Sequence, residues 1–316
     1  MLTLLFFSFS PLVDSLLIKA VECSYVEDFI RAESLITFAK RQEKENPAPY
    51  FLLASLYEMM WVDLGEPSLE TKIFTYADST ITKAKKWVKK NPLDPWGYFF
   101  IGGSYTLKVF YYVMKEDYLG SIFLLNPGVY YLEKAKEIDS TLYDVYLGLG
   151  GWEYIKGKFP LVKENKEKAL TMIEKAISKG KFVSHYSIVA YANICIREKD
   201  YDQAILMLKP LLDSYPSSRT FNWPFLKALY GKKDYERALK VAEKLIEISS
   251  YNNFSKFEAY YYKIKILLEL GELEEAKTNV EIALNINVLE EMLNVKERKK
   301  ELKQIKRKLE KELKRA

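Results

Sequence analysis

Two stretches of the chain repeat one another at an offset of 34 residues. Residues 199–216 read KDYDQAILMLKPLLDSYP and residues 233–249 read KDYERALKVAEKLIEIS, so that Tyr201 corresponds to Tyr235. A fixed period of this length predicts a fold of stacked supersecondary units. One such unit cannot bury its apolar surface alone, so each unit needs a neighbour on both sides.

The composition indicates that these units are helical. Hydrophobic residues make up 49% of the 316 residues, which is enough for a large core, whereas Gly and Pro number only 13 and 11. Proline-containing stretches read as helix ends at 46–49, 91–95 and 215–218, because proline cannot continue a helix. No segment shows the Val-, Ile- and Thr-rich alternation of a strand.

The spacing of small and aromatic residues in 186–216 resembles the tetratricopeptide repeat. Ala192 takes the small position of the first helix and Tyr201 the aromatic position at the turn. Ala204 takes the small position of the second helix and Pro216 the terminal position. The resemblance, to bacterial proteins of this kind with an export-like N-terminus, implies an all-α, right-handed α-α superhelix, or solenoid, of about seven helical hairpins plus a C-terminal capping helix.

The resemblance covers most of residues 14–288, which we interpret as the solenoid. Three central repeats are longer than the others, and the extra residues fall between the first and second helices. Gly102 and Gly150 occupy small positions in these repeats, where we expect helices to approach closely.

A charged helix is predicted for residues 289–316. Leu302, Ile305, Leu309 and Leu313 form one apolar stripe on it. The open end of a solenoid needs a cap with a polar outer face, so a cap is the favoured interpretation. A coiled-coil dimer seam and a basic membrane-surface helix are the alternatives.

The net charge of +5 comes from this end of the chain. Residues 296–316 hold eleven Lys and Arg against four acidic residues, so the rest of the chain holds 37 against 39. A nucleic-acid-binding protein normally carries a basic field over one face. The sequence therefore predicts no nucleic-acid partner.

Residues 1–13 contain an apolar run from Leu2 to Phe9, too short to span a bilayer. The run resembles the hydrophobic part of a secretory signal, although no Lys or Arg precedes it. We expect an exported protein, periplasmic or associated with the cell envelope, and any membrane association through this segment alone. The alternative is a cytoplasmic protein whose first helix is apolar.

The sequence predicts no enzyme, cofactor or metal. His185 is the only histidine, and Cys23 and Cys195 are the only cysteines, so neither a zinc site nor a disulfide framework is expected. We expect both cysteines to be small buried core residues.

Binding is what the resemblance implies, because the first helices of such repeats line a concave surface. Chaperone-binding members clamp a terminal carboxylate with Lys and Asn, but the corresponding fifth positions of these repeats are apolar, so we predict no such clamp. The predicted partner-binding groove is aromatic and cationic, and its residues are Tyr186, Asn193, Arg197, Trp223, Lys227, Tyr230, Tyr261 and Lys265.

The sequence thus favours a non-catalytic scaffold that binds a protein or peptide, of the kind that serves cell-envelope assembly or export. The alternative is a regulatory or ligand-sensing subunit of an enzyme or transporter complex.

Overall fold

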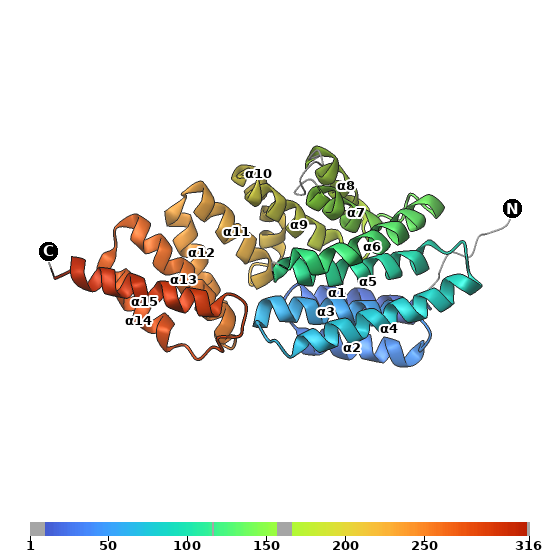
Figure 1. Cartoon of the computed structure of the whole chain (residues 1–316), viewed down its shortest axis with the longest axis horizontal. Coiled ribbons are helices and arrows are strands. Elements are labelled where there is room, and N and C mark those ends of the chain that lie inside the picture. The colour runs from blue at the N-terminus through green and yellow to red at the C-terminus, as the bar shows by residue number, and fades with distance from the viewer. Residues whose placement is uncertain (1–9, 116, 157–165, 315–316) are drawn as a thin grey trace. The chain divides into compact units, whose positions relative to one another are not determined.

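A computed structural model describes residues 10–115, 117–156 and 166–314, and over these ranges the chain forms fifteen α-helices and no β-strand (Figure 1). The helices are α1 (Pro11–Ser24), α2 (Phe29–Gln42), α3 (Ala48–Leu64), α4 (Leu69–Lys90), α5 (Pro95–Met114), α6 (Tyr118–Ile138), α7 (Val145–Lys156), α8 (Lys166–Lys179), α9 (Ser184–Arg197), α10 (Tyr201–Ser214), α11 (Arg219–Lys232), α12 (Tyr235–Ile248), α13 (Asn253–Leu270), α14 (Leu273–Asn285) and α15 (Val295–Glu312). Seven consecutive hairpins and one final helix account for them all, so the predicted all-α fold is confirmed.

The chain divides into two compact units. The N-terminal unit consists of residues 1–59 and 68–191. The C-terminal unit consists of residues 60–67 and 192–316.

The turn between the two helices of a hairpin is closed by the same backbone hydrogen bond in several repeats. The donor amide and acceptor carbonyl are Asp28 and Cys23 at 3.0 Å, Asp200 and Cys195 at 2.8 Å, Asp234 and Leu229 at 3.0 Å, and Glu272 and Leu267 at 2.9 Å. The residue before each donor has a positive φ, which is 62° at Lys199 and 65° at Lys233. The sequence repeat is therefore also a repeat of backbone conformation, of the helix-ending type that satisfies exposed carbonyls.

The small positions of the repeats lie where helices touch. The alanines at these positions in the last three hairpins are fully buried, and they are Ala192, Ala204, Ala238, Ala276 and Ala283. Gly102 serves the same purpose in α5, because a Cβ atom there would lie 2.9 Å from the carbonyl oxygen of Gly128 in α6. Cys23 and Cys195 are also buried, as expected.

The second and third hairpins contain most of their extra residues as helix. Helices α3 to α6 have 17, 22, 20 and 21 residues, whereas α9 to α12 have 14 each. The insertion of the fourth hairpin falls largely on residues 157–165, which lie outside the described residues.

Helix α15 covers the end of the last hairpin. Leu302 is buried in a cluster with Val280 of α14, and Leu309 is buried against Leu267 of α13. Ile305 packs between the two clusters. The apolar stripe of α15 is thus used inside the chain, as the predicted cap requires.

Residues 60–67 are held in the C-terminal unit by a buried ion pair. The Nε and Nη2 atoms of Arg219 donate to the two carboxylate oxygens of Asp63 at 2.8 and 2.7 Å. The side-chain amide of Asn252 donates to the backbone oxygen of Asp63 at 2.8 Å and to its carboxylate at 3.1 Å. Next to them Gly65 has a φ of 68°, and a Cβ atom there would meet the ring of Phe254 at 2.7 Å.

The first helix begins at Pro11 and not at residue 14. The side chain of Ser10 accepts a hydrogen bond from the amide of Val13, and proline is favourable at the first helical position. Val13 is buried, whereas Pro11 and Leu12 are exposed, so Val13 alone of these three residues joins the core. The rest of the predicted targeting segment, residues 1–9, lies outside the described residues. Among the helices of the described ranges, none is both long enough and apolar enough to cross a bilayer.

Candidate protein-interaction face

The predicted groove residues do not all belong together. Tyr186 lies in the N-terminal unit, and its ring packs at 5.4 Å between centroids against Tyr25. Its hydroxyl shares a hydrogen bond of 2.8 Å with Ser24. Tyr186 is therefore engaged in packing between α1 and α9. The other seven predicted residues lie in the C-terminal unit.

Helices α11 and α13 bring aromatic rings together in the C-terminal unit. Trp223 and Tyr230 are seven residues apart on α11, which places them two turns apart on one helix face. Both rings pack at 6.0 Å between centroids against Tyr262 of α13. The amino group of Lys265 lies 5.7 Å from the centre of the Tyr230 ring. Stacking of a lysine on a tyrosine holds the charge close to an apolar surface.

We name this surface the α11–α13 face and define it by Trp223, Lys227, Tyr230, Tyr262 and Lys265. Tyr262 connects the two helices, and the sequence-based prediction missed it. The signal was present in the run of three tyrosines at 260–262, but the repeat pattern assigns the inward position to its neighbour Tyr261.

Tyr261 does not offer an open surface, because α15 covers it. The Tyr261 side chain is only 8% exposed, and its hydroxyl donates to a carboxylate oxygen of Glu301 at 2.6 Å. The guanidinium of Arg298 lies 4.5 Å from the centre of its ring. Burial, reinforced by Glu301, raises the pKa of the Tyr261 hydroxyl well above its ordinary value. This position therefore differs from the open groove anchor that the sequence predicts.

Positive charge converges beside the α11–α13 face. Lys227 reaches solvent, although protein surrounds much of its side chain, and this desolvation lowers its pKa. The nearby Glu258 carboxylate opposes the shift, whereas the charges of Arg298 and Arg197 add to it. Asn193 and Arg197 are exposed on α9. Arg298 and Arg197 are thus the cations, and Glu258 the acid, that act on Lys227.

Glu258 is the acid in this cluster and is already engaged. One of its carboxylate oxygens forms an ion pair with Arg298, and the other is buried with no hydrogen-bond partner among the described residues. Burial raises the pKa of Glu258 to about 7, against the opposing charges of Arg298 and Lys227. Positive charge therefore exceeds negative charge around Lys227, whereas Glu269 and Glu301 act on the neighbouring Tyr230 hydroxyl.

Some solved structures are similar to this chain. No protein-family model and no curated protein matches the sequence. Among solved structures, the human IFIT1 dimer with PPP-AAAA has a TM-score of 0.50 at 14% identity over 91% of this chain and 70% of its own. A tetratricopeptide protein of Thermus thermophilus has a TM-score of 0.46 at 16% identity over 69% of this chain and 99% of its own. One from Parabacteroides merdae has a TM-score of 0.42 at 14% identity over 94% and 98%. The repeated turns and the buried alanines described above decide the architecture. The fold is a tetratricopeptide-type solenoid.

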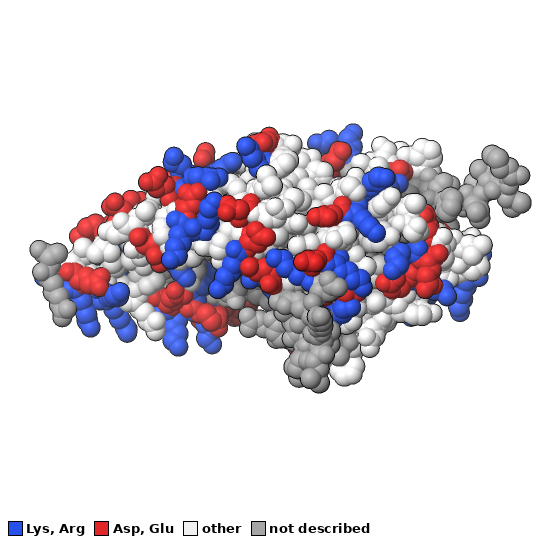
Figure 2. Space-filling view, turned by 90° about the horizontal axis from the view of Figure 1, so that it is seen from above, with Lys and Arg blue, Asp and Glu red and all other residues white. Residues whose placement is uncertain are grey.

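The charge on this tetratricopeptide-type solenoid is mixed. Figure 2 shows basic and acidic side chains interspersed over the face that it presents, and not one continuous basic field. In the described ranges, no three His, Cys, Asp or Glu side chains are placed to hold a metal ion. The α11–α13 face is thus where predicted groove residues come together, with aromatic rings beside lysines.

Proposed function

We propose that the chain is a non-catalytic scaffold that binds an acidic peptide segment of another protein on the α11–α13 face. The observation that carries the proposal is the excess charge around Lys227. Glu258 is the acid that acts on Lys227, and its carboxylate is already paired with Arg298. Asp or Glu side chains of a partner would supply the missing negative charge.

The rings define the rest of the partner's chemistry. Trp223, Tyr230 and Tyr262 are each half-buried, and Arg298 of α15 lies 5.8 Å from the centre of the Tyr262 ring. Aromatic side chains beside a cation are typical anchors of protein interfaces. A segment with apolar side chains between acidic ones fits both features, whether it binds extended or as a helix.

Selection from a random peptide display library on the purified chain tests this proposal. We expect enrichment of peptides that combine Asp or Glu with Leu, Phe or Trp. Fluorescence anisotropy with a selected peptide should show that Lys227→Glu weakens binding by about tenfold or more. Trp223→Ala should also weaken it. Lys303→Glu makes the same charge change at an exposed site of α15 and should leave the dissociation constant unchanged.

Two results would refute the proposal. One is enrichment of peptides without acidic residues. The other is a selected peptide whose affinity is the same for the wild type and for a folded Lys227→Glu variant.

We further propose that residues 1–13 direct the chain out of the cytoplasm and that it serves cell-envelope assembly or export. The support is the apolar run from Leu2 to Phe9. N-terminal sequencing of the protein from its native cell tests this. Cleavage near residue 10, or retention on a membrane, is expected, and an intact Met1 on soluble cytoplasmic protein would refute the idea.

A further inference from the structure

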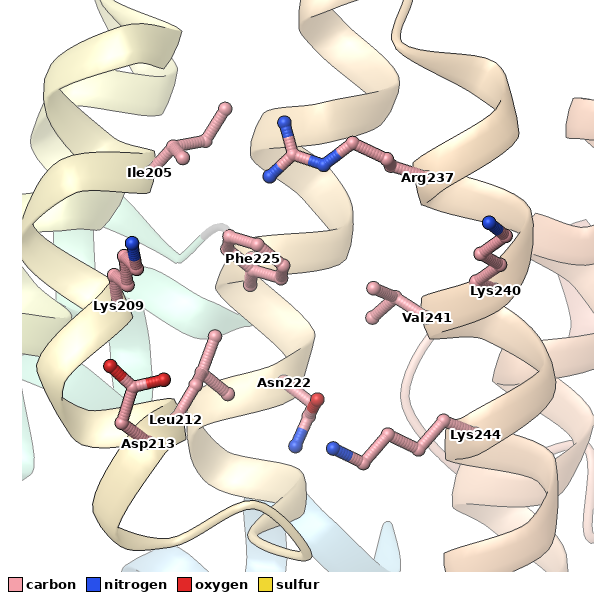
Figure 3. Close-up of a pocket in the computed structure, with 10 residues that line it drawn as sticks. All are labelled: Ile205, Lys209, Leu212, Asp213, Asn222, Phe225, Arg237, Lys240, Val241 and Lys244. Carbon is pink, nitrogen blue, oxygen red and sulfur yellow. The ribbon is translucent and has the colours of Figure 1, made fainter.

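A second concave site lies on the other side of α11, between α10 and α12 (Figure 3). Its volume is about 450 Å³. The lining residues are Ile205, Lys209, Leu212, Asp213, Asn222, Phe225, Arg237, Lys240, Val241 and Lys244. We name this site the α10–α12 groove. Figure 3 shows the Phe225 ring at the centre, with Lys209 on one side and Arg237 and Lys240 on the other.

The equivalent positions in the next repeat, between α12 and α14, carry side chains that pair with one another. Lys263 of α13 extends its amino group to Glu243 on α12 and to Glu275 on α14, at 3.0 Å from each. The Lys263 side chain is 13% exposed. An acid, a lysine and a second acid thus close that groove and neutralise one another.

The α10–α12 groove has the opposite chemistry at the same repeat positions. By the offset that relates Ala204 to Ala238, the first acid becomes Lys209. By the offset that relates Ala238 to Ala276, the lysine becomes Phe225 and the second acid becomes Arg237. A ring flanked by two cations cannot neutralise itself. Asp213 is the one acid among the lining residues, against four cations, so the groove as a whole is positively charged.

The cations of the groove are mostly unpaired within the chain. Among the described residues, no carboxylate lies within ion-pair distance of Lys209, Lys240 or Lys244. Arg237 pairs with Asp234 at 3.0 Å, but over half of the Arg237 side chain is exposed. Exposed pairs of this kind contribute little stability and are easily exchanged for another partner.

We propose that the α10–α12 groove is a docking site for an acidic amphipathic helix of a partner protein. On α12 the lining residues run from Arg237 to Lys244, so the groove is about 10 Å long, or two helical turns. Ile205, Leu212, Phe225 and Val241 are its apolar lining, Lys209 lies on one edge beside Asp213, and Arg237, Lys240 and Lys244 lie on the other edge. A helix with an apolar stripe, flanked on each side by Asp or Glu, matches this arrangement in charge, shape and length. Neither Trp223 nor Lys227 lines it, so this site is distinct from the α11–α13 face.

A synthetic helix of about sixteen residues, with a leucine stripe flanked by glutamates, is the probe. Isothermal titration with the full chain should show binding that weakens as salt is raised. The same peptide with glutamine in place of glutamate should bind at least about tenfold more weakly. Titration of the Lys227→Glu variant, in which the proposed peptide face is weakened, should still show this binding, which separates the two sites.

The neighbouring groove supplies a matched variant. Lys209→Glu, Phe225→Lys and Arg237→Glu together copy the self-neutralising residues of the α12–α14 groove, so the fold should tolerate them. The affinity of this triple variant for the acidic helix should be about tenfold lower or more, while its circular dichroism and melting temperature are maintained. If it does not fold, Lys240→Glu with Lys244→Glu reverses the charge of one edge and should give the same loss.

Several outcomes would overturn the proposal. They are no binding of the acidic helix, equal binding of the glutamine helix, or a folded variant with unchanged affinity. Binding to phosphatidylserine vesicles that is lost in the triple variant, without binding of the peptide, would assign the groove to an anionic membrane instead.

Discussion

Removal of one member of the Asp63–Arg219 pair should strongly destabilise the C-terminal unit. The Asp63 and Arg219 side chains are 7% and 15% exposed, and they form two hydrogen bonds with each other. In Asp63→Asn the guanidinium stays buried without its counter-charge, and Asn252 loses a carboxylate acceptor. Breaking a buried pair in this way costs about 3–5 kcal/mol of unfolding free energy. That is a large share of the total stability of a domain.

Urea denaturation followed by circular dichroism measures this loss, and the double variant tests its cause. Asp63→Leu with Arg219→Met replaces both charges by apolar groups, so it should cost less than the two single substitutions together. Asp202→Asn is the matched control. It removes an ion pair with Lys232 in which both side chains are exposed, and it should cost no more than about 1 kcal/mol. The pair does not hold this unit together if Asp63→Asn costs as little as the control. The same follows if the cost of the double variant equals the sum of the costs of Asp63→Leu and Arg219→Met.

Three further predictions concern stability. Ala204→Trp and Ala238→Trp should each cost about 1–3 kcal/mol or more, because both alanines are fully buried between helices, and a wild-type melting temperature would disprove the repeat register. Lys233→Gly should stabilise the chain by up to about 1 kcal/mol in a urea titration, because Lys233 has a φ of 65°. Lys232→Gly, at the last residue of α11, should destabilise it. The difference in unfolding free energy between the wild type and Glu258→Gln should shift against the wild type as the pH rises from about 4.5 to 7. The reason is that Glu258 binds its proton more tightly in the folded state. The shift should reach up to about 3 kcal/mol, and parallel pH curves for the two proteins would show that Glu258 is not perturbed.

The sequence by itself determined the contacts that recur with the repeat. Ala204 and Ala238 could be placed at helix contacts because a fixed period forces equivalent residues into equivalent surroundings. The apolar stripe of Leu302 and Leu309 likewise required a surface to cover, and the end of the last hairpin was the available one. Local rules of this kind depend on positions three, four or thirty-four residues apart, which can be read along the chain.

The tertiary structure alone decided which positions remain open to a partner. Tyr261 occupies an inward repeat position, yet α15 covers it through Arg298 and Glu301, and no periodic pattern relates α15 to α13. Tyr262 joins the rings of α11 and α13 because of the rotation of one helix relative to the next. The open charge of the α10–α12 groove depends on side chains from three helices meeting in space. Such meetings are set by how successive hairpins pack, and the spacing of residues along one helix does not contain that information.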